Sequence, residues 1–388
     1  MIEIQPVETA SARNAFMRLP WALHAGQPAW VPPLLADQRR QLDPRRGEYF
    51  RAGNSGALWL ARRDGRVVGR IAAFRNEAHL RSHADGAGFF GFFECVDDAV
   101  VARRLLAVAE EWLRHAGLDR ARGPANFNIQ EEAGVLLDAF DLQPMLGMTW
   151  TPPYYRTLLE QAGYAPCRDL RVYRTDWATE RPEQAERLMR VARLVEQRGD
   201  VVVRNLDLRQ LERESRHLAT VFAEAWHDNW GHVPISAAEF LELYQRYQTF
   251  LVPELVYLAE VGGEPAGAFV AMPDLNVPIK AIDGRLWPLG WWKLLRARKK
   301  ITRYRAMMMG VRPQYRRLGL PLIFITRCRE ELRRRGATLL ELSWVLDDNV
   351  EIISSVERLG ARQVQTLRLY EKSLSRKDSP SAAAEHPF

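Results

Sequence analysis

Apolar and polar positions alternate with two periods along the chain, and these periods recur in the same order in its two halves. A period near 3.6 residues indicates a helix, whereas alternation at every second residue indicates a strand. Long helices separated by strands predict an α/β fold with a mixed sheet. In the second half the expected elements are a helix near Leu208–Trp226, a hairpin at Glu254–Met272, a strand at Arg305–Val311, a helix at Pro321–Arg335, a strand at Thr338–Val345, a helix at Asn349–Leu359 and a strand at Gln363–Glu371.

An internal repeat predicts that the two halves are diverged copies of one domain. Residues 257–267 repeat the pattern of residues 59–69 at an offset of 198, and both stretches predict two strands joined by a glycine-containing hairpin turn. Residues 357–370 repeat residues 160–173 at an offset of 197. The expected organisation is an N-terminal domain at 1–177, a linker at 178–204, a C-terminal domain at 205–373 and a disordered tail at 374–388.

Composition is that of a globular protein of a reducing compartment. Hydrophobic residues make up 47% and charged residues 27% of the 388 positions, which excludes the disordered and fibrous classes. Three widely spaced cysteines, Cys95, Cys167 and Cys328, fit neither a disulfide framework nor a zinc cluster. The chain shows neither a signal peptide at its start nor an apolar run of the roughly 18 residues that a spanning helix needs. We therefore expect a cytoplasmic protein that is at most peripheral at the inner membrane face.

Positive charge is concentrated in one segment. The net charge is +7 and the isoelectric point is near 9.4, and residues 293–305 contain seven basic residues and no acidic one. An anionic partner is expected, although charge alone leaves nucleic acid, anionic lipid and a phosphorylated cofactor open. His24, His227 and His232 show no metal-ligand spacing, so no metal is expected.

In the second half a predicted strand runs through a glycine-containing loop into a predicted helix. The apolar strand Met307–Val311 is followed by the loop 312–321. Backbone N–H groups of such a loop, together with the open N-terminus of the helix, form an anion pocket that suits a pyrophosphate. Gly319 permits close approach of the backbone, and Pro321 suits a first helical turn because no N–H is needed there.

This junction resembles the GCN5-related N-acetyltransferase (GNAT) superfamily, whose signature is Arg/Gln-x-x-Gly-x-Gly/Ala between its fourth strand and third helix. Arg316-x-x-Gly319-x-Pro321 matches the first two positions and departs at the third. The segment Glu341–Asn349 is similar to the family's fifth strand and its Asn-led fourth helix, and Leu359–Ala361 is similar to its Leu-Gly-Phe turn. The resemblance is strong in the second copy and weak in the first.

The resemblance implies two tandem GNAT-like domains, with acyl-coenzyme A as co-substrate of the second domain and an amine as acceptor. The first copy is not expected to bind coenzyme A, because the junction from Glu94 to Asp98 lacks the glycine and its carboxylates repel phosphate. Phrases such as Gly123–Asn128 are similar to a bacterial tandem branch that includes ceramide synthases. The residues expected to bind the cofactor are Met309, Gly310, Val311, Arg316, Arg317, Leu318, Gly319, Leu320, Pro321 and Asn349.

Acyl transfer to an amine needs a base for the amine, a donor for the oxyanion and a proton for the thiolate. The family's proton-donating tyrosine is replaced by Val356, so Tyr154 or Tyr155 of the first copy, or water, is left for that role. Phenylalanines around Glu94 are expected to raise its pKa toward neutrality, as a base requires. A helix cap or an ion pair is the alternative role for each carboxylate, including Asp347. The predicted catalytic residues are Glu94, Asp274, Tyr155 and Asp348.

Loop asparagines and aromatic residues are candidates for the acceptor site, with turn formation as the alternative role of the asparagines. Residues 286–305 combine three tryptophans with the basic run, which is typical of a helix lying on an anionic membrane. A lipid acceptor is therefore expected, and the alternative is a helix whose tryptophans pack on the core. The residues expected to bind the acceptor are Asn126, Asn128, Tyr154, Trp226, Asn229, Trp291 and Trp292.

Three functions compete at this point. The first is an acyl-coenzyme A dependent N-acyltransferase acting on a lipophilic amine such as a sphingoid base. The second is a Fem-type aminoacyl-tRNA dependent transferase, which would explain the basic charge through RNA phosphates. The third is a non-catalytic coenzyme A-binding protein. The pyrophosphate loop favours the first, because a tRNA-dependent enzyme does not need it, and nucleic acid is not the expected partner.

Overall fold

The computed structural model describes residues 1–176, 182–197 and 201–374. The first half begins with an edge strand and ends with the long strand β7. Its strands are β1 (Ile2–Pro6), β2 (Ser55–Arg63), β3 (Arg66–Arg75), β4 (Ala87–Cys95), β5 (Arg120–Gly123), β6 (Val135–Leu136) and β7 (Ala165–Asp176). Its helices are α1 (Ala10–Leu23), α2 (Leu35–Gln41), α3 (Glu48–Arg51), α4 (Glu77–His83), α5 (Ala99–His115) and α6 (Tyr154–Gln161).

The second half contains every element that its sequence predicts, with small shifts at their ends. Its strands are β8 (Val201–Asn205), β9 (Val256–Val261), β10 (Glu264–Pro273), β11 (Arg303–Val311), β12 (Leu339–Leu346) and β13 (Arg362–Ser373). Its α-helices are α7 (Pro182–Glu196), α8 (Leu211–Ala225), α9 (Ala237–Tyr247), α10 (Asn276–Ala281), α11 (Gly290–Ala297), α12 (Leu320–Arg334) and α13 (Val350–Arg358), joined by the 3₁₀ segments η1 (Pro253–Leu255), η2 (Arg298–Lys300) and η3 (Pro313–Leu318).

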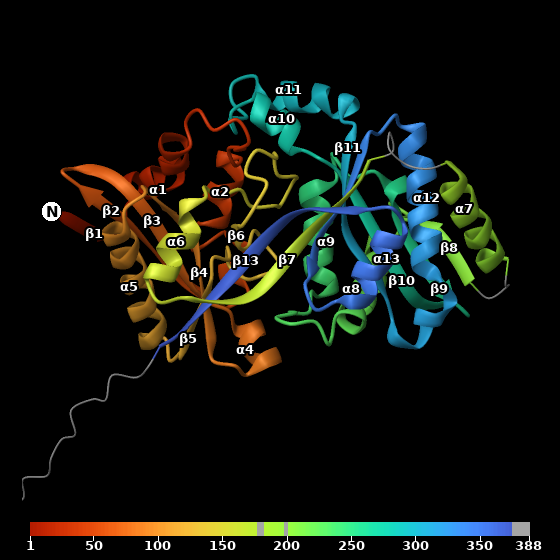
Figure 1. Cartoon of the computed structure of the whole chain (residues 1–388), viewed down its shortest axis with the longest axis horizontal. Coiled ribbons are helices and arrows are strands. Elements are labelled where there is room, and N and C mark those ends of the chain that lie inside the picture. The colour runs from red at the N-terminus through yellow and green to blue at the C-terminus, as the bar shows by residue number, and fades with distance from the viewer. Residues whose placement is uncertain (177–181, 198–200, 375–388) are drawn as a thin grey trace, which may run out of the picture.

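Helices cover both faces of the sheet in the same arrangement in each half (Figure 1). In the first half α5 and α6 pack on one face and α1 packs on the other. In the second half α12 packs on one face and α8 on the other. Helix α5 shows why: Val101, Leu105 and Leu113 lie along one stripe and are fully buried, whereas Glu111 on the opposite side is exposed.

The two halves exchange their last strands, and the strands of the described residues form one continuous sheet (Figure 1). Strand β7 of the first copy pairs antiparallel with β12 of the second. Strand β13 of the second copy pairs antiparallel with β5 and β6 of the first, and β7 and β13 also pair with each other. The predicted boundaries at 177 and 205 therefore do not separate two independent sheets, because each sheet is completed by a strand from the other copy.

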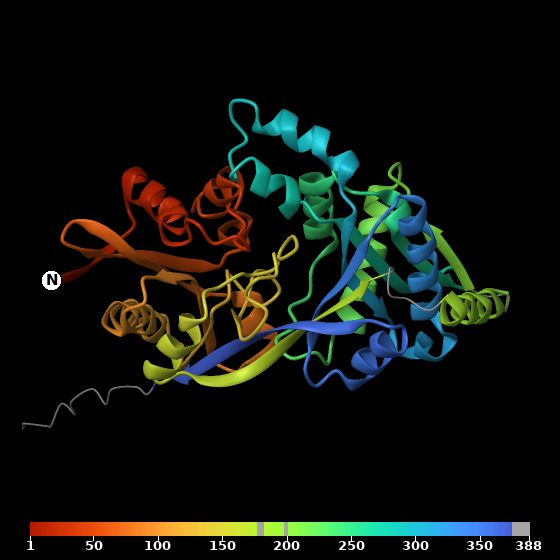
Figure 2. The same ribbon diagram turned by 45° about the horizontal axis from the view of Figure 1, so that its top comes forward.

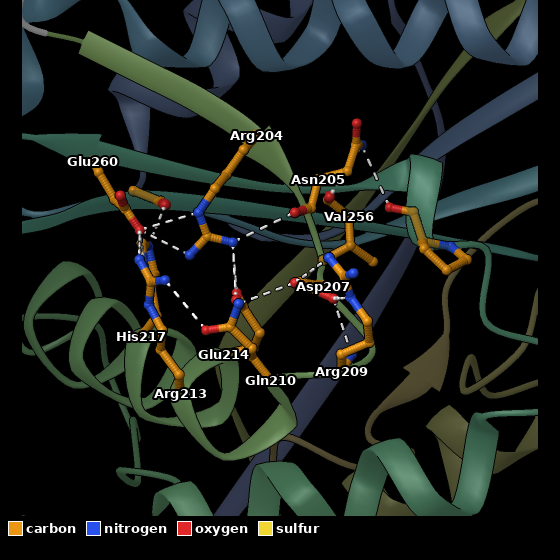
Figure 3. A network of polar contacts seen from close by, with 12 residues as sticks. Arg204, Asn205, Asp207, Arg209, Gln210, Arg213, Glu214, His217, Val256 and Glu260 are labelled. Atoms are coloured by element: carbon orange, nitrogen blue, oxygen red, sulfur yellow. Dashed lines mark hydrogen bonds and ion pairs between the residues drawn. The ribbon is translucent and has the colours of Figure 1, made fainter. Parts of the chain in front are cut away.

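The segment predicted as a linker, 178–204, also carries structure that belongs to the second half. Helix α7 lies on α12, and β8 forms the outer edge of the sheet against β9. Arg204 of β8 fixes this edge, because its guanidinium bonds Glu214 of α8 at 2.9 Å and Glu260 of β9 at 2.8 Å (Figure 3). Glu214 is almost fully buried, so this pair anchors the strand from inside.

The structure describes part of the predicted linker and one residue of the predicted tail. Residue 177 of the expected N-terminal domain, residues 178–181 and 198–200 of the expected linker, and residues 375–388 of the expected tail lie outside the described residues. Leu374, placed in the tail by the sequence, is buried in the core of the first half, and its N–H donates to the carbonyl of Asp119 at 2.7 Å. The core of the first half therefore includes the first residue of the predicted tail.

Two neighbouring parallel strands diverge in each half. Strand β11 pairs with β12 only over Arg303–Ala306, and β4 pairs with β5 only over Ala87–Phe89. The register between β10 and β11, like that between β3 and β4, shifts at a β-bulge. One edge of β11 from Met307 onward is thus left free of strand partners, next to the predicted phosphate loop.

An insertion in the second half reaches across to the first. Helices α10 and α11 project from the second half and lie beside α1 and α2 (Figures 1 and 2). Ile279 and Leu294 pack with Val31 and Leu34 of the first half. The indole N–H of Trp21 donates to Asp283 at 2.9 Å. The insertion is therefore a second contact between the halves, in addition to the exchanged strands.

The strand exchange predicts cooperative unfolding of the whole chain. Leu369 of β13 is fully buried in the core of the first half. We expect Leu369→Ala to lower the free energy of unfolding by about 2–5 kcal/mol, because it leaves a cavity in that core, and to shift both halves together. Guanidinium unfolding followed by circular dichroism and tryptophan fluorescence measures this. The exposed Arg362→Ala on the same strand is the control, and two separate transitions would contradict the expectation.

Candidate active site

The junction between β11 and α12 in the second half is open to an anion. Gly319 adopts the left-handed conformation, with φ of +73°, between η3 and α12. No side chain of the described residues caps the N-terminus of α12, so its first N–H groups are available. Arg316 and Arg317 are exposed beside it. The 3₁₀ turns of η3 bond part of the loop's amides internally, which leaves the helix N-terminus and the two arginines as the anion-binding groups.

Two of the predicted site residues meet on β11. The indole of Trp226, at the end of α8, lies against the backbone of Gly310: a Cβ built on this glycine would lie 2.1 Å from Trp226 Cζ3. Only glycine permits this approach. Trp226 therefore covers one face of β11 at the predicted thioester site, and Met309 is partly buried next to it.

The equivalent junction of the first half is closed by its own side chains. Asp98 caps α5, and its Oδ1 accepts from the N–H groups of Val100 at 2.7 Å and Val101 at 3.2 Å. A carboxylate thus occupies the helix N-terminus that a phosphate would need, and it repels a second anion.

Tyr154 and Tyr155 fill the space beside β4. The hydroxyl of Tyr155 accepts from the N–H of Cys95 at 3.1 Å and donates to Glu94 at 2.6 Å. The hydroxyl of Tyr154 donates to the carbonyl of Cys95 at 2.9 Å. The backbone of β4 at this point is therefore bonded within the protein, unlike the free edge of β11.

The structure corrects the prediction for the pKa of Glu94. Burial alone would raise this pKa, as the sequence suggested, but three side chains outweigh burial and hold the pKa below its usual value. His24 lies 2.7 Å from Glu94 Oε2, the hydroxyl of Tyr155 donates to the same oxygen, and Arg70 lies 3.7 Å from Oε1. Glu94 is therefore an ionised carboxylate at neutral pH and a weaker base than expected.

A cavity of about 320 Å³ lies between the two halves, and Glu94 and Asn126 line it. Sequence reasoning missed two further carboxylates on its wall, Glu131 and Glu132. Both side chains are exposed at this cavity, which is partly open to solvent. The surrounding protein, which removes part of the hydration of Glu131, and the charge of Glu132 raise the pKa of Glu131 to about 7. The surrounding protein also raises the pKa of Glu132, against the opposing charge of Arg70. The signal was a Glu-Glu pair directly after the phrase Gly123–Asn128, inside the insertion of the first copy.

Asp274 is buried between the halves and holds backbone in place. Its Oδ1 accepts from the N–H groups of Leu146 in the first half and Asn276 in the second, each at 3.1 Å. Arg303 lies 3.1 Å from Oδ2. Burial raises the pKa of Asp274 to about 6 despite this arginine. Since the side chain is fully buried, the geometry assigns it to positioning rather than to proton transfer with a substrate.

The remaining predicted carboxylate and amides take structural contacts. Arg168 donates to Asp348 at 2.5 Å, and Asn349 caps α13 by accepting from the N–H of Ile352 at 3.2 Å. Asn128 accepts from the N–H of Gln130 at 2.7 Å, and the N–H of Asn229 donates to the carbonyl of Trp226 at 2.8 Å, so both lie in turns. The structure thus places Asp348, Asn349, Asn128 and Asn229 in the alternative roles that the sequence left open.

The tryptophans of the insertion lie on the surface. Trp291 and Trp292 are about half exposed on α11, and Trp287 is 83% exposed nearby, so they do not pack on the core. Within residues 1–176, 182–197 and 201–374, no three His, Cys, Asp or Glu side chains are placed to hold a metal ion.

Solved structures share the fold of the chain. A tandem GNAT protein from the clavulanic acid biosynthesis pathway matches 97% of this chain and 100% of its own, with a TM-score of 0.58 and 14% identity. A GCN5-related N-acetyltransferase from Sphaerobacter thermophilus matches 97% of this chain and 96% of its own, with a TM-score of 0.54 and 16% identity. The predicted fold, two tandem GNAT domains, is confirmed.

Full-length relatives give the family. The bacterial ceramide synthase of Caulobacter vibrioides is 35% identical over 381 residues, which cover 96% of this chain and 98% of that protein. Protein YghO of Escherichia coli is 32% identical over 376 residues, 93% of each chain. No protein-family model matches the chain. The chain belongs to the bacterial ceramide synthase family of tandem GNAT acyltransferases, and the predicted enzyme class, N-acyltransferase, is confirmed.

The positioning role of Asp274 predicts how stability depends on pH. A carboxyl whose pKa rises from 3.8 to about 6 on folding makes the native state bind more protons between these values, so wild-type stability falls as pH rises through this window. Asp274→Asn removes this contribution and keeps an oxygen for both N–H groups. We expect its stability relative to wild type to be higher at pH 7 than at pH 4.

The comparison variant is Asp274→Ala, which leaves two buried N–H groups without an acceptor and should cost about 1–3 kcal/mol for each at both pH values. Urea unfolding at the two pH values measures these differences. Equal stability of the alanine variant and wild type would contradict the positioning role.

Proposed function

We propose that the chain transfers an acyl group from acyl-coenzyme A to the amine of a lipophilic acceptor such as a sphingoid base. The second half binds the coenzyme A pyrophosphate at residues 316–321. The thioester, when bound, supplies the acyl carbonyl, and the free edge of β11 from Met309 to Val311 supplies backbone N–H groups for its oxygen.

The contrast between the two junctions carries this proposal. The same fold appears twice, and only the second copy combines a left-handed glycine, an uncapped helix N-terminus and exposed arginines. In the first copy Asp98 fills the corresponding helix N-terminus. A GNAT acyltransferase with one open and one closed junction is expected to bind the diphosphate at the open one, where the charge is positive.

The acceptor assignment rests on the relatives and on the surface. The relative in Caulobacter vibrioides is named a ceramide synthase. A sphingoid base, the amine acceptor that we propose, carries its amine on a long apolar chain. Glu94 and Asn126, which face the cavity, remain our candidates for contacting the acceptor. Tyr155 holds Glu94 and the backbone of β4 and acts as a positioning residue, while Arg168 engages Asp348 away from the cavity.

The exposed surface of α11 supports contact with an anionic membrane. Trp287, Trp291 and Trp292 are exposed next to the basic residues Lys293 and Arg296, a combination that partitions to the headgroup region. Every helix within the described ranges is too short or too polar to cross a bilayer. A lipophilic acceptor would reach this enzyme from the membrane surface.

The pyrophosphate site predicts a charge-specific loss of binding. Gly319→Glu should abolish acyl-coenzyme A binding, because it places a carboxylate at the helix N-terminus, and Arg316→Ala should weaken binding by about tenfold through loss of a phosphate contact. Titration calorimetry with palmitoyl-coenzyme A measures both.

Gly336→Glu is a matched control for that experiment. Gly336 has φ of +67° and follows the C-terminal end of the same helix, so backbone strain and added charge are similar while the anion site is distant. The space around Gly336 is open, whereas a Cβ on Gly319 would also lie 3.3 Å from Val195. Equal loss of binding in the two glutamate variants would mean that folding, and not phosphate recognition, was measured.

The membrane surface predicts a salt-dependent interaction. We expect the full-length protein to sediment with vesicles of phosphatidylglycerol and phosphatidylethanolamine and to be released as salt screens the basic residues. Replacement of Trp287, Trp291 and Trp292 by alanine should remove most of this binding, because the indole rings no longer enter the headgroup region. Val350→Ala, which removes a 67% exposed apolar side chain elsewhere, should have no effect. Unchanged sedimentation of the tryptophan variant would contradict membrane contact through α11.

A further inference from the structure

The cavity between the halves contains more negative charge than its own arginines neutralise. The charged groups on its wall are Asp37, Glu94, Glu131, Glu132, Arg40, Arg70 and Arg246. Each arginine already pairs with another carboxylate: Arg40 with Asp37 at 3.4 Å, Arg70 with Glu94 at 3.7 Å, and Arg246 with Glu48. No salt bridge among the described residues reaches Glu131 or Glu132. Arg70 lowers the pKa of Glu132 through its charge, but its ion pair is with Glu94.

Two adjacent carboxylates on the cavity wall repel each other, and the surrounding protein removes part of their hydration. Both effects oppose ionisation, and this is why the pKa of Glu131 is raised to about 7. One oxygen of Glu132 accepts from the amide of Asn126 at 3.0 Å, which is a neutral donor. A cation in the cavity would stabilise both ionised carboxylates, and within the described residues Arg70, already paired with Glu94, acts on Glu132 without forming a salt bridge to it.

Two further polar side chains on the same wall have an atom without a hydrogen-bond partner. Gln38 is 7% exposed, and its Oε1 has no hydrogen-bond partner within the described residues. Arg70 is 3% exposed, and its Nε is likewise without a hydrogen-bond acceptor there, although its other nitrogens donate to the carbonyl of Phe16 and form the ion pair with Glu94. Gln38 can accept from a hydroxyl group of a ligand and Arg70 can donate to one, so the cavity suits a ligand that carries hydroxyl groups.

The rest of the wall is apolar and is built by both halves. Trp30, Phe127 and Trp150 come from the first half, and Phe250 and Leu294 come from the second. A volume of about 320 Å³ is at the lower end for small-molecule sites, so it suits a polar headgroup with the first part of an apolar chain. Leu294 belongs to α11, whose other face carries the exposed tryptophans, so the apolar wall continues toward the proposed membrane surface.

The cavity also adjoins the strand that we assign to the thioester. Leu146 and Gly147 line it, and the carbonyl of Leu146 accepts from the guanidinium of Arg305 at 2.5 Å. Arg305 lies on β11 within the last residues that still pair with β12. The loop that contains Leu146 and Gly147 therefore lies between a headgroup in the cavity and the point at which β11 stops pairing with β12.

We propose that this cavity binds the acceptor by its ammonium group, with Glu131 and Glu132 as charge partners, Gln38 as acceptor for a neighbouring hydroxyl, and the aromatic wall around the start of an apolar chain. The inference rests on the proposed function and adds to it: the first half, whose coenzyme A junction is closed, recognises the amine. Recognition of donor and acceptor is thereby divided between the two copies.

Direct binding without any acyl donor tests this assignment. The probes are dodecylamine and its N-acetyl derivative, below their micelle concentrations, titrated into the full-length protein. They share a chain and differ in charge. We expect wild-type protein to bind the amine at least about tenfold more tightly than the neutral amide, as a paired buried charge provides. The double variant Glu131→Gln, Glu132→Gln should lose this preference and retain the neutral amide.

Glu111→Gln removes an exposed carboxylate of α5 and controls for net charge; it should keep the preference. The glutamine pair removes a repulsion and should not lower the melting temperature, so loss of preference in a folded variant is interpretable. Gln38→Leu should weaken binding of a long-chain 2-amino-1,3-diol more than of dodecylamine, because only the diol has hydroxyl groups. An unchanged amine preference in the double variant would overturn the proposal.

A failure of the proposed reaction gives a different result from a failure of this site. Turnover is measured separately, as thiol release from palmitoyl-coenzyme A with a long-chain 2-amino-1,3-diol. Absence of palmitoyl-coenzyme A binding and of turnover, with the amine preference intact, would overturn acyl transfer alone. With turnover present, the double variant should raise KM for the amine and leave KM for palmitoyl-coenzyme A unchanged, whereas equal changes in both would contradict a site specific for the acceptor.

Discussion

The antiparallel pairing of β7 with β13 is the contact on which both halves depend. Each strand is the last of its own copy, and each completes the sheet of the other: β7 against β12, and β13 against β5 and β6. Side chains of these strands enter both cores, as Leu369 and Tyr173 do from opposite copies. Neither half can bury its core without the other chain segment, so the cavity between them has walls of fixed spacing.

The shared sheet contains the same strand-to-helix junction twice, between β4 and α5 and between β11 and α12. The charge of the side chains at each junction determines whether it can bind an anion. Diverging strands leave backbone N–H groups and a helix N-terminus in both halves. Asp98 and Tyr155 accept hydrogen bonds from these groups in the first half, whereas Gly319 and two arginines leave them accessible in the second. A few side chains, and no change of fold, therefore separate a closed junction from an anion-binding one.

The sequence predicted what depends on local pattern and missed what depends on partners far along the chain. Periodicity and the Gly319 loop predicted β11, α12 and the GNAT class, because strand, turn and helix signals lie within a short stretch. The strand exchange was not predictable, since β7 and β13 carry equivalent patterns and either pairing buries them equally well. The predicted rise in the pKa of Glu94 was wrong. His24, 70 residues away along the chain, and Arg70 stabilise the ionised carboxylate by more than the apolar surroundings destabilise it. Glu131 and Glu132 were overlooked because their significance comes from their place on the wall of a cavity that only the fold creates, where no described residue forms a salt bridge with them.

Duplication offers a physical reason for placing donor and acceptor recognition in different copies. A pyrophosphate requires positive potential and free N–H groups, while an ammonium requires carboxylates; within one small cleft each set would weaken the other through charge pairing and repulsion. Arg316 beside Glu131 would form an internal salt bridge and bind neither ligand well. The exchanged strands hold two oppositely charged sites in one rigid sheet at a distance. In the proposed division the first copy loses its diphosphate site, which Asp98 closes, and contributes Glu131 and Glu132 to the cavity wall that would receive the amine.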